Sequence, residues 1–299
     1  CGNRTEEDTV TRVPNYVVAY EATAQGRDAL ELGIAMARLT SAELRICLVL
    51  QRAGSVPAKI YATRSEFEEL LALQAEQWLA EALTLLPGDV VATTHLVWAE
   101  STTEGLLQAA ADFGSDRVVV GAARDGILHR FTIGSVANAL LHSSPVPVAL
   151  APSNYRAPDT VSRITCAIGT RPGWEALLDS VAALTEGLNV DLRFVTLVEI
   201  DAAHDKRPTA ADSGTHLESV LSYYQRHARG SGNITTEVGS GASLEAAVEA
   251  LEWRPDELAI VGSSRLAAPR TIFLGITAHR MLHSLPVPLI VVPASPPRS

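Results

Sequence analysis

The chain has 299 residues, of which 47% are hydrophobic and only 5% aromatic, and its formal net charge is −10 at pH 7. This length leaves room for two domains that each bury a core. The Ala-, Val- and Leu-rich apolar content is typical of helices packed on parallel strands. The acidic balance argues against a nucleic-acid partner, since the longest basic cluster is Lys206-Arg207. No apolar run approaches the roughly 18 residues of a membrane span, so a membrane partner is not expected.

The amino-terminal residues are polar and lack the apolar core of a signal peptide, which indicates a soluble, cytoplasmic protein. A start of Cys-Gly-Asn would also suit a processed lipoprotein, and the sequence leaves that alternative open. The three cysteines show no Cys-x-x-Cys spacing. Cys47 and Cys166 lie in apolar, strand-like runs and are expected to be buried structural thiols.

Short β-branched runs alternate with longer helical patterns along the first half of the chain. The expected elements are a strand over 16–20, a helix over 24–40, a strand over 44–50, a helix over 65–86, a strand over 90–97, a helix over 102–113, a strand over 117–121, a helix over 134–142 and a strand over 146–150. Ser65 and Glu68 predict a capping box at the start of the second helix. Strands separated by such helices require right-handed crossovers and a mostly parallel sheet with helices on both faces.

The end of the first half recurs 141 residues later, where LHSSPVPV at 141–148 returns as LHSLPVPL at 282–289. The same offset carries Gly121 onto Gly262 and Gly134 onto Gly275. A repeat of this length indicates two copies of a domain rather than a solenoid. The expected organisation is a tail over 1–13, a first domain over 14–153, a Pro- and Ser-rich linker over 154–162, a second domain over 163–294 and a tail over 295–299.

Each last strand follows a Pro-Val-Pro run, and proline in a strand suits a sheet edge. An apolar edge invites pairing. We therefore expect residues 146–150 to pair with 287–292. The predicted fold is α/β, with two tandem doubly wound, mostly parallel five-stranded sheets packed as an internal pseudo-dimer.

A glycine-bearing run, GAARDGILHRFTIGSVA at 121–137, joins the fourth strand to the last helix. A loop that leaves a parallel strand and ends at a helix N-terminus is suited to phosphate, because backbone N–H groups and the helix dipole meet there. Gly134 and Ser135 would supply donors, and Gly121 would permit close passage of a ligand.

This run resembles the universal stress protein family, whose nucleotide-binding members carry G-x2-G-x9-G-[S/T] before a helix and a Pro-Val-Pro strand. Each half of the chain shows this resemblance, so that together the two matches cover essentially the whole chain. The resemblance implies an adenine nucleotide alpha hydrolase-like fold. By position it implies that Glu21 and Val49, at the ends of the first two strands, hold base and ribose. The remaining positions of the implied site are Ala123, Arg124 and Val136 in the first copy and Gly262, Arg265 and Gly275 in the second.

One departure from the family pattern occurs in both copies, and the second copy has further ones. Arg124 and Arg265 replace the second loop glycine, where a guanidinium would either clamp a phosphate or fill its space. The second copy has Ile168-Gly169-Thr170 after its first strand, without a carboxylate, and Ile276 where a hydroxyl is expected. The second site is therefore the weaker candidate.

Other chemistries have little support in the sequence. Neither a Cys-x-x-Cys pair nor a His/carboxylate cluster suggests a metal site, and His142 and His283 suit the ends of their helices. Neither a G-x-S-x-G elbow nor a G-x4-G-K-[S/T] loop is present, so an enzyme is not expected, although slow ATP hydrolysis stays open.

We therefore expect a ligand-responsive regulatory module that binds an adenine nucleotide, ATP with Mg, in its first domain. The alternative is a nucleotide-free interaction or scaffold protein of the same family, in which both sites have decayed. Either reading is compatible with a protein partner, which the sequence does not name, and with a homodimer of two chains.

Overall fold

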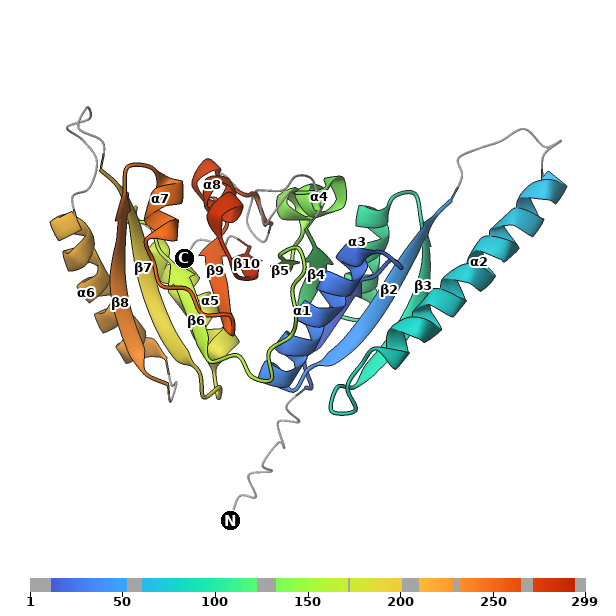
Figure 1. Ribbon diagram of the computed structural model, residues 1–299, viewed down its shortest axis with the longest axis horizontal. Coiled ribbons are helices and arrows are strands. Elements are labelled where there is room, and N and C mark those ends of the chain that lie inside the picture. The colour runs from blue at the N-terminus through green and yellow to red at the C-terminus, as the bar shows by residue number, and fades with distance from the viewer. Residues whose placement is uncertain are drawn as a thin grey trace, which may run out of the picture.

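The computed structural model describes residues 12–52, 61–122, 133–171, 173–200, 210–228, 232–264 and 271–293, with only the backbone described over 61–66. Strands and helices alternate through both halves of this part of the chain (Figure 1). Among the described residues, no helix is both long and apolar enough to cross a membrane.

The first copy contains five strands and four helices in its described residues. They are β1 (Asn15–Ala19), α1 (Ala24–Thr40), β2 (Glu43–Gln51), α2 (Tyr61–Thr84), β3 (Ala92–Ala99), α3 (Thr102–Asp112), β4 (Arg117–Gly121), α4 (Ser135–Ser143) and β5 (Val148–Ala151). Side-chain caps start two of these helices, since Thr23 accepts from the Gly26 N–H and Ser101 from the Glu104 N–H.

The second copy repeats this order over its described residues. Its elements are β6 (Arg163–Ala167), α5 (Trp174–Thr185), β7 (Asp191–Glu199), α6 (Ala210–His227), β8 (Ile234–Gly241), α7 (Leu244–Glu249), β9 (Glu257–Gly262), α8 (Ile276–Ser284) and β10 (Leu289–Val292). The predicted β-α-β-α-β-α-β-α-β order is confirmed in both halves.

The strands form one ten-stranded sheet in the order β3-β2-β1-β4-β5-β10-β9-β6-β7-β8. The pairing of the two copies is antiparallel, with Leu150 opposite Leu289 and Val148 opposite Val291, whereas the other neighbouring strands are parallel. The expected junction between the two last strands is confirmed. Figure 1 shows β5 and β10 at the centre, with α2 and α6 at opposite ends of the molecule.

Helices cover both faces of the sheet. One apolar cluster joins side chains of α1, α2, α5 and α6, including Leu30, Leu79 and Leu217. The other cluster lies under α3, α4, α7 and α8 and includes Leu106 and Leu282. Each cluster runs through both copies, so the two halves share their cores across the β5–β10 junction.

The segment between β5 and β6 lies along α1. The Asn154 N–H donates to Oδ2 of Asp28 at 3.1 Å, and the Ala157 N–H donates to Oε2 of Glu31 at 2.9 Å. Tyr155 is buried. The predicted linker is thus attached to the first copy by two carboxylates of one helix.

Three predicted boundaries are corrected. Helix α2 begins at Tyr61, so Ser65 lies inside the helix and the capping box predicted at its start is wrong. Strand β3 begins and ends two residues later than expected. Strand β5 begins at Val148 rather than at residue 146, because Pro147 has no N–H for the ladder and contributes only its carbonyl, which accepts from Val118.

Candidate functional site

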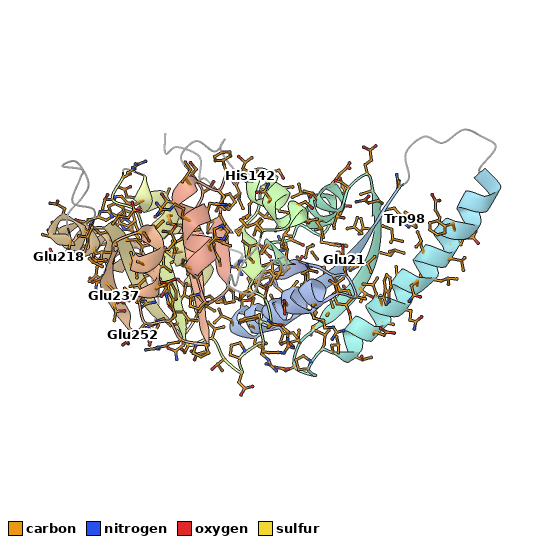
Figure 2. The ribbon with its side chains drawn as sticks, turned by 45° about the horizontal axis from the view of Figure 1, so that its top comes forward. Glu21, Trp98, His142, Glu218, Glu237 and Glu252 are labelled. Carbon is orange, nitrogen blue, oxygen red and sulfur yellow. The ribbon has the colours of Figure 1, made fainter. Side chains whose placement is uncertain are left out.

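The carboxyl ends of β1, β2 and β4 meet at one edge of the sheet. Ala19 is in register with Cys47, and Val18 with Val119. Glu21 therefore follows β1 at this edge, where it is exposed (Figure 2). Its carbonyl accepts from the Thr23 N–H at 2.7 Å, which starts the turn into α1.

Val49 faces the side of the sheet that α3 and α4 cover. Its Cγ1 lies 2.6 Å from the position that a Cβ on Gly105 would occupy, so α3 approaches β2 closely at this glycine. Val49 packs against the same apolar cluster as Ile133 and Val136, which flank the start of α4. The structure thus places Val49 and the start of α4 on one face of the sheet.

Gly121 ends β4 directly beside the first turn of α1. A Cβ at this position would lie 2.1 Å from the carbonyl oxygen of Gln25. Close packing of two backbones therefore requires glycine here, independently of any ligand.

Helix α4 begins with Gly134 as its N-cap, in extended geometry with φ −68° and ψ 165°. Ser135 is the first helical residue and is exposed. Since glycine has no side chain, the first-turn N–H groups of α4 are not capped from this position, unlike those of α1 and α3. A helix N-terminus of this kind can accept an anion.

The second copy reproduces the helix start but not its surroundings. Gly275 caps α8 with φ −70° and ψ 162°, and a Cβ there would lie 3.3 Å from Cβ of Ser264. Ile276, the first residue of α8, is 82% exposed where the first copy has Ser135. The neighbours of Gly262 are side-chain atoms of Leu177, at 3.3 Å or more, rather than backbone.

A histidine lies beside the end of β6 in the second copy. His216 of α6 is hydrogen-bonded to the backbone of Gly169, and its ring meets that of Trp174 edge-on at 5.4 Å. Burial lowers the pKa of His216, and the hydrogen bond with Gly169 opposes that shift in part. The imidazole of His216 gives this end of β6 a different chemistry from the end of β1, which Glu21 follows.

The predicted site residues Ala123, Arg124 and Arg265 lie outside the described residues. The positions that the structure does place are Glu21, Val49, Gly121, Gly134, Ser135 and Val136 in the first copy and Gly262 and Gly275 in the second. The two buried cysteines are also where the sequence puts them. Burial raises the pKa of the Cys47 thiol to about 12 and also raises that of Cys166.

Sequence reasoning overlooked a histidine pair. His279 and His283 stand one turn apart on α8, a His-x-x-x-His spacing, with their Nε2 atoms 3.4 Å apart. The pKa of His279 is lowered, first by burial and then by His283 and His142. Within the described ranges, His, Cys, Asp and Glu side chains form no group of three that suits a metal ion.

A buried ionic network in the second copy was also missed. Both oxygens of Glu257 are engaged, Oε2 by Arg163 at 2.5 Å and Oε1 by Arg193 at 3.0 Å. Thr165 donates to the same carboxylate. Arg193 also pairs with Glu237 at 2.8 Å, and its guanidinium carbon lies 5.0 Å from the ring centroid of Trp253. The sequence offers only a faint signal, namely charged residues inside apolar strand runs.

Comparison with known proteins identifies the family. The family model described as "Universal stress protein family" matches residues 14–152 and 160–293. Universal stress protein Rv2319c of Mycobacterium tuberculosis and Universal stress protein Mb2346c of Mycobacterium bovis are each 27% identical to the chain over 292 residues, which covers 93% of the chain and 99% of the relative.

Solved structures support the same fold. A universal stress protein from Archaeoglobus fulgidus DSM 4304 aligns with a TM-score of 0.63 at 15% identity, covering 94% of this chain and 98% of that one. A putative universal stress protein from Pseudomonas aeruginosa UCBPP-PA14 aligns with a TM-score of 0.56 at 14% identity, covering 94% and 93%. Since the family match accounts for both copies, the chain belongs to the universal stress protein family, in a tandem arrangement of two domains joined through β5 and β10.

Proposed function

We propose that the protein is a ligand-responsive regulator that binds an adenine nucleotide, ATP with Mg, in its first copy. The observation that carries this proposal is the start of α4. Gly134 leaves the first-turn N–H groups without a side-chain cap, and Ser135 exposes a hydroxyl beside them. Val49 faces the same side of the sheet. Glu21 follows β1 at the carboxyl edge, where doubly wound sheets bind ligands.

The second copy is proposed to bind nucleotide weakly or not at all. Its helix start has the same backbone geometry, but Ile276 supplies no hydroxyl and the end of β6 has no carboxylate. Regulation through one nucleotide site needs no catalytic group, and we propose binding rather than turnover. A cytoplasmic site of action, where adenine nucleotides are abundant, belongs to the same proposal.

Thermal unfolding with and without Mg-ATP tests this function. A ligand present at 100 times its Kd stabilises the native state by about 2.7 kcal/mol. We expect a rise in Tm for the wild-type protein. Gly134→Val should abolish this rise, because the added side chain would stand at the helix start while φ −68° remains an allowed angle for valine.

The repeat supplies a matched control. Gly275 has nearly the same backbone angles in the second copy, so Gly275→Val makes the same chemical change at the other helix start. It should leave the Mg-ATP response intact. An unchanged response in Gly134→Val would contradict the proposal.

One observation favours a second candidate, a nucleotide-free scaffold. The close contact with the Gln25 carbonyl is sufficient to require glycine at position 121, so this part of the glycine pattern does not depend on a ligand. If Mg-ATP leaves the Tm of the wild type unchanged, the scaffold is the better description. The next measurements would then be the oligomeric state and the search for a protein partner.

A further inference from the structure

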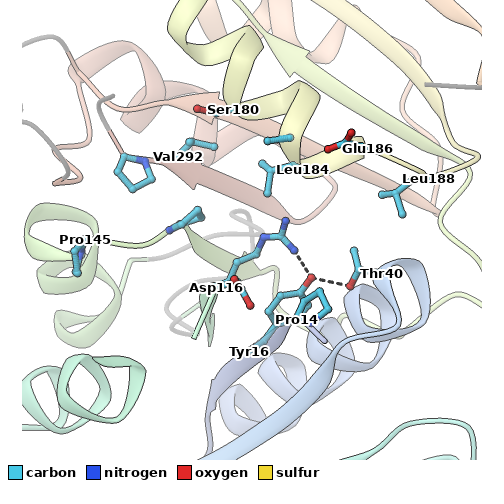
Figure 3. Close-up of a pocket in the computed structure, with 14 residues that line it drawn as sticks. Pro14, Tyr16, Thr40, Asp116, Pro145, Ser180, Leu184, Glu186, Leu188 and Val292 are labelled. Atoms are coloured by element: carbon cyan, nitrogen blue, oxygen red, sulfur yellow. Dashed lines mark hydrogen bonds between the residues drawn. The ribbon is translucent and has the colours of Figure 1, made fainter. Parts of the chain in front are cut away.

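A cavity of about 540 Å³ lies between the two copies (Figure 3). Pro14 and Arg117 line it from the starts of β1 and β4, and Leu184 lines it from α5 of the second copy. At the opposite ends of the same two parallel strands, Glu21 follows β1 and Gly121 ends β4. The cavity is therefore separate from the proposed nucleotide site.

Arg117 brings a buried positive charge to this cavity. The residue is only 7% exposed, and its guanidinium donates to the Tyr16 hydroxyl and lies 4.8 Å above the Tyr16 ring. Tyr16 is in turn hydrogen-bonded to Thr40 at 2.7 Å, and both bonds are drawn in Figure 3. Nε of Arg117 is buried without a hydrogen-bond partner.

No carboxylate among the described residues forms an ion pair with Arg117. The neighbouring Asp116 is engaged elsewhere, since its Oδ2 accepts from the Asn15 N–H at 2.9 Å and pairs with Arg12 at 3.3 Å. A buried charge without a counter-charge is unfavourable. An anion from solution would relieve this cost.

The second copy shows how the same fold neutralises buried arginines. Glu257, the first residue of β9, neutralises Arg163 and Arg193 with its carboxylate. In the first copy, the residue 141 positions before Glu257 is Asp116, which also lines the cavity, but its carboxylate pairs with Arg12 and not with Arg117.

We propose that this cavity binds a small organic monoanion, a carboxylate carried on an apolar body, with Arg117 as its anchor. One guanidinium matches one carboxylate and can bind it through two parallel hydrogen bonds. Much of the remaining lining is apolar, including Pro147, Leu188 and Val292. The volume is in the range of small-molecule sites, which extends from about 300 to 1,000 Å³.

The other polar groups of the lining favour a single negative charge. The hydroxyls of Thr40 and Ser180 donate to backbone carbonyls of their own helices, at 2.8 and 3.0 Å. Asp116 and Glu186 also line the cavity, and their carboxylates add negative charge there. A nucleotide or another polyanion is disfavoured there by like charge.

Calorimetric titration and thermal unfolding with sodium octanoate and sodium benzoate test the proposal, with octan-1-ol as the neutral comparison. We expect one-site binding of at least one carboxylate, a rise in Tm and no comparable effect of the alcohol. Failure of both carboxylates to bind, or equally tight binding of octan-1-ol, would overturn it.

Arg117→Met tests the anchor. The variant should fold, because replacing a buried charge by an apolar side chain of similar size is often neutral or stabilising. Carboxylate affinity should fall at least about tenfold, as expected for loss of a charged hydrogen-bonding partner. Wild-type affinity in this variant would refute the role of Arg117.

Arg45→Met is the matched control, since Arg45 pairs with Glu43 on β2 and does not line the cavity; its carboxylate affinity should be unchanged. If Arg117→Met does not fold, Ala183→Phe provides a second test, because Ala183 is exposed on α5 and lines the cavity. The phenylalanine should block carboxylate binding, and unchanged binding would count against the proposal.

The nucleotide site and the carboxylate site can be refuted independently of each other. Gly134→Val should retain the carboxylate response, and Mg-ATP should not displace the carboxylate. Displacement of octanoate or benzoate by Mg-ATP would place both ligands in one site and would overturn the proposal of a separate carboxylate site.

Discussion

Gly121 and Gly262 occupy equivalent positions in the two copies, but their neighbours differ. A methyl group on Gly121 would lie 2.1 Å from a backbone carbonyl oxygen, whereas one on Gly262 would lie 3.3 Å from the nearest atom of the flexible Leu177 side chain. Backbone atoms cannot move aside as a side chain can. The same substitution should therefore have unequal effects in the two halves.

We expect Gly121→Ala to lower the free energy of unfolding by about 1–3 kcal/mol, the usual effect of overpacking. Gly262→Ala should change it by less. Urea unfolding of both variants measures the difference. Equal losses would show that the contact with Gln25 does not distinguish the two positions.

Glu257 holds two arginines in the interior of the second copy. Removing it leaves Arg163 and Arg193, whose side chains are 11% and 3% exposed, without their shared carboxylate. Glu257→Ala should lower the free energy of unfolding by about 3–5 kcal/mol, because breaking a buried ion pair leaves uncompensated charge. Chemical denaturation measures this loss.

Glu245 provides a surface comparison for that prediction. It pairs with Arg280 at 2.8 Å, and the hydrogen bonds with Arg280 lower its pKa to about 2. An exposed pair contributes at most about 1 kcal/mol, so Glu245→Ala should have a much smaller effect. Comparable losses in the two variants would contradict the special role of Glu257.

At the scale of elements, α1 has two functions. It covers one face of the sheet with residues such as Leu30, and it holds the segment between the copies through Asp28 and Glu31. Asp28 is fully buried, and its acceptor engages the N–H of Asn154, whose backbone has a positive φ of 63°. The carboxylate thus stabilises a turn at the exit from the first copy.

Asp28→Ala should destabilise the protein by about 1–3 kcal/mol, because the Asn154 N–H loses the buried carboxylate that accepts its hydrogen bond. Asp28→Asn keeps an oxygen at nearly the same place and should retain most of the stability. Thermal unfolding compares the two. If both substitutions have the same effect, the hydrogen bond to the linker is not the cause.

At the scale of the molecule, the continuous sheet and shared apolar clusters predict that the two copies unfold together. The buried thiols offer one reporter in each copy, Cys47 on β2 and Cys166 on β6. Burial raises both pKa values and keeps the thiols from forming the reactive thiolate.

In a Cys1→Ser background, both thiols should resist a disulfide reagent in the native state and react at the same rate near the unfolding midpoint. Mass spectrometry of the labelled peptides separates the two sites. Much faster labelling of one cysteine would show that one copy opens independently of the other.

The sequence by itself determined the element order, the duplication and the family, because alternating apolar periods and a repeat of 141 residues are local patterns. The run before α4 also indicated a helix start suited to an anion. The junction of β5 and β10 followed from an apolar strand beside prolines, which predicts an edge in need of a partner.

Only the tertiary structure decided which charged residues face each other. Arg117 and Glu257 both begin strands, and their sequence neighbours do not indicate that one lines a cavity while the other neutralises two arginines. That outcome depends on side chains from distant segments: Arg193 pairs with Glu257, and Leu184 of the second copy lines the cavity of Arg117 from across the junction. Burial removes water from these charges, so the electrostatic interaction of each charge with its neighbours becomes strong. Local sequence patterns do not encode which neighbours those are.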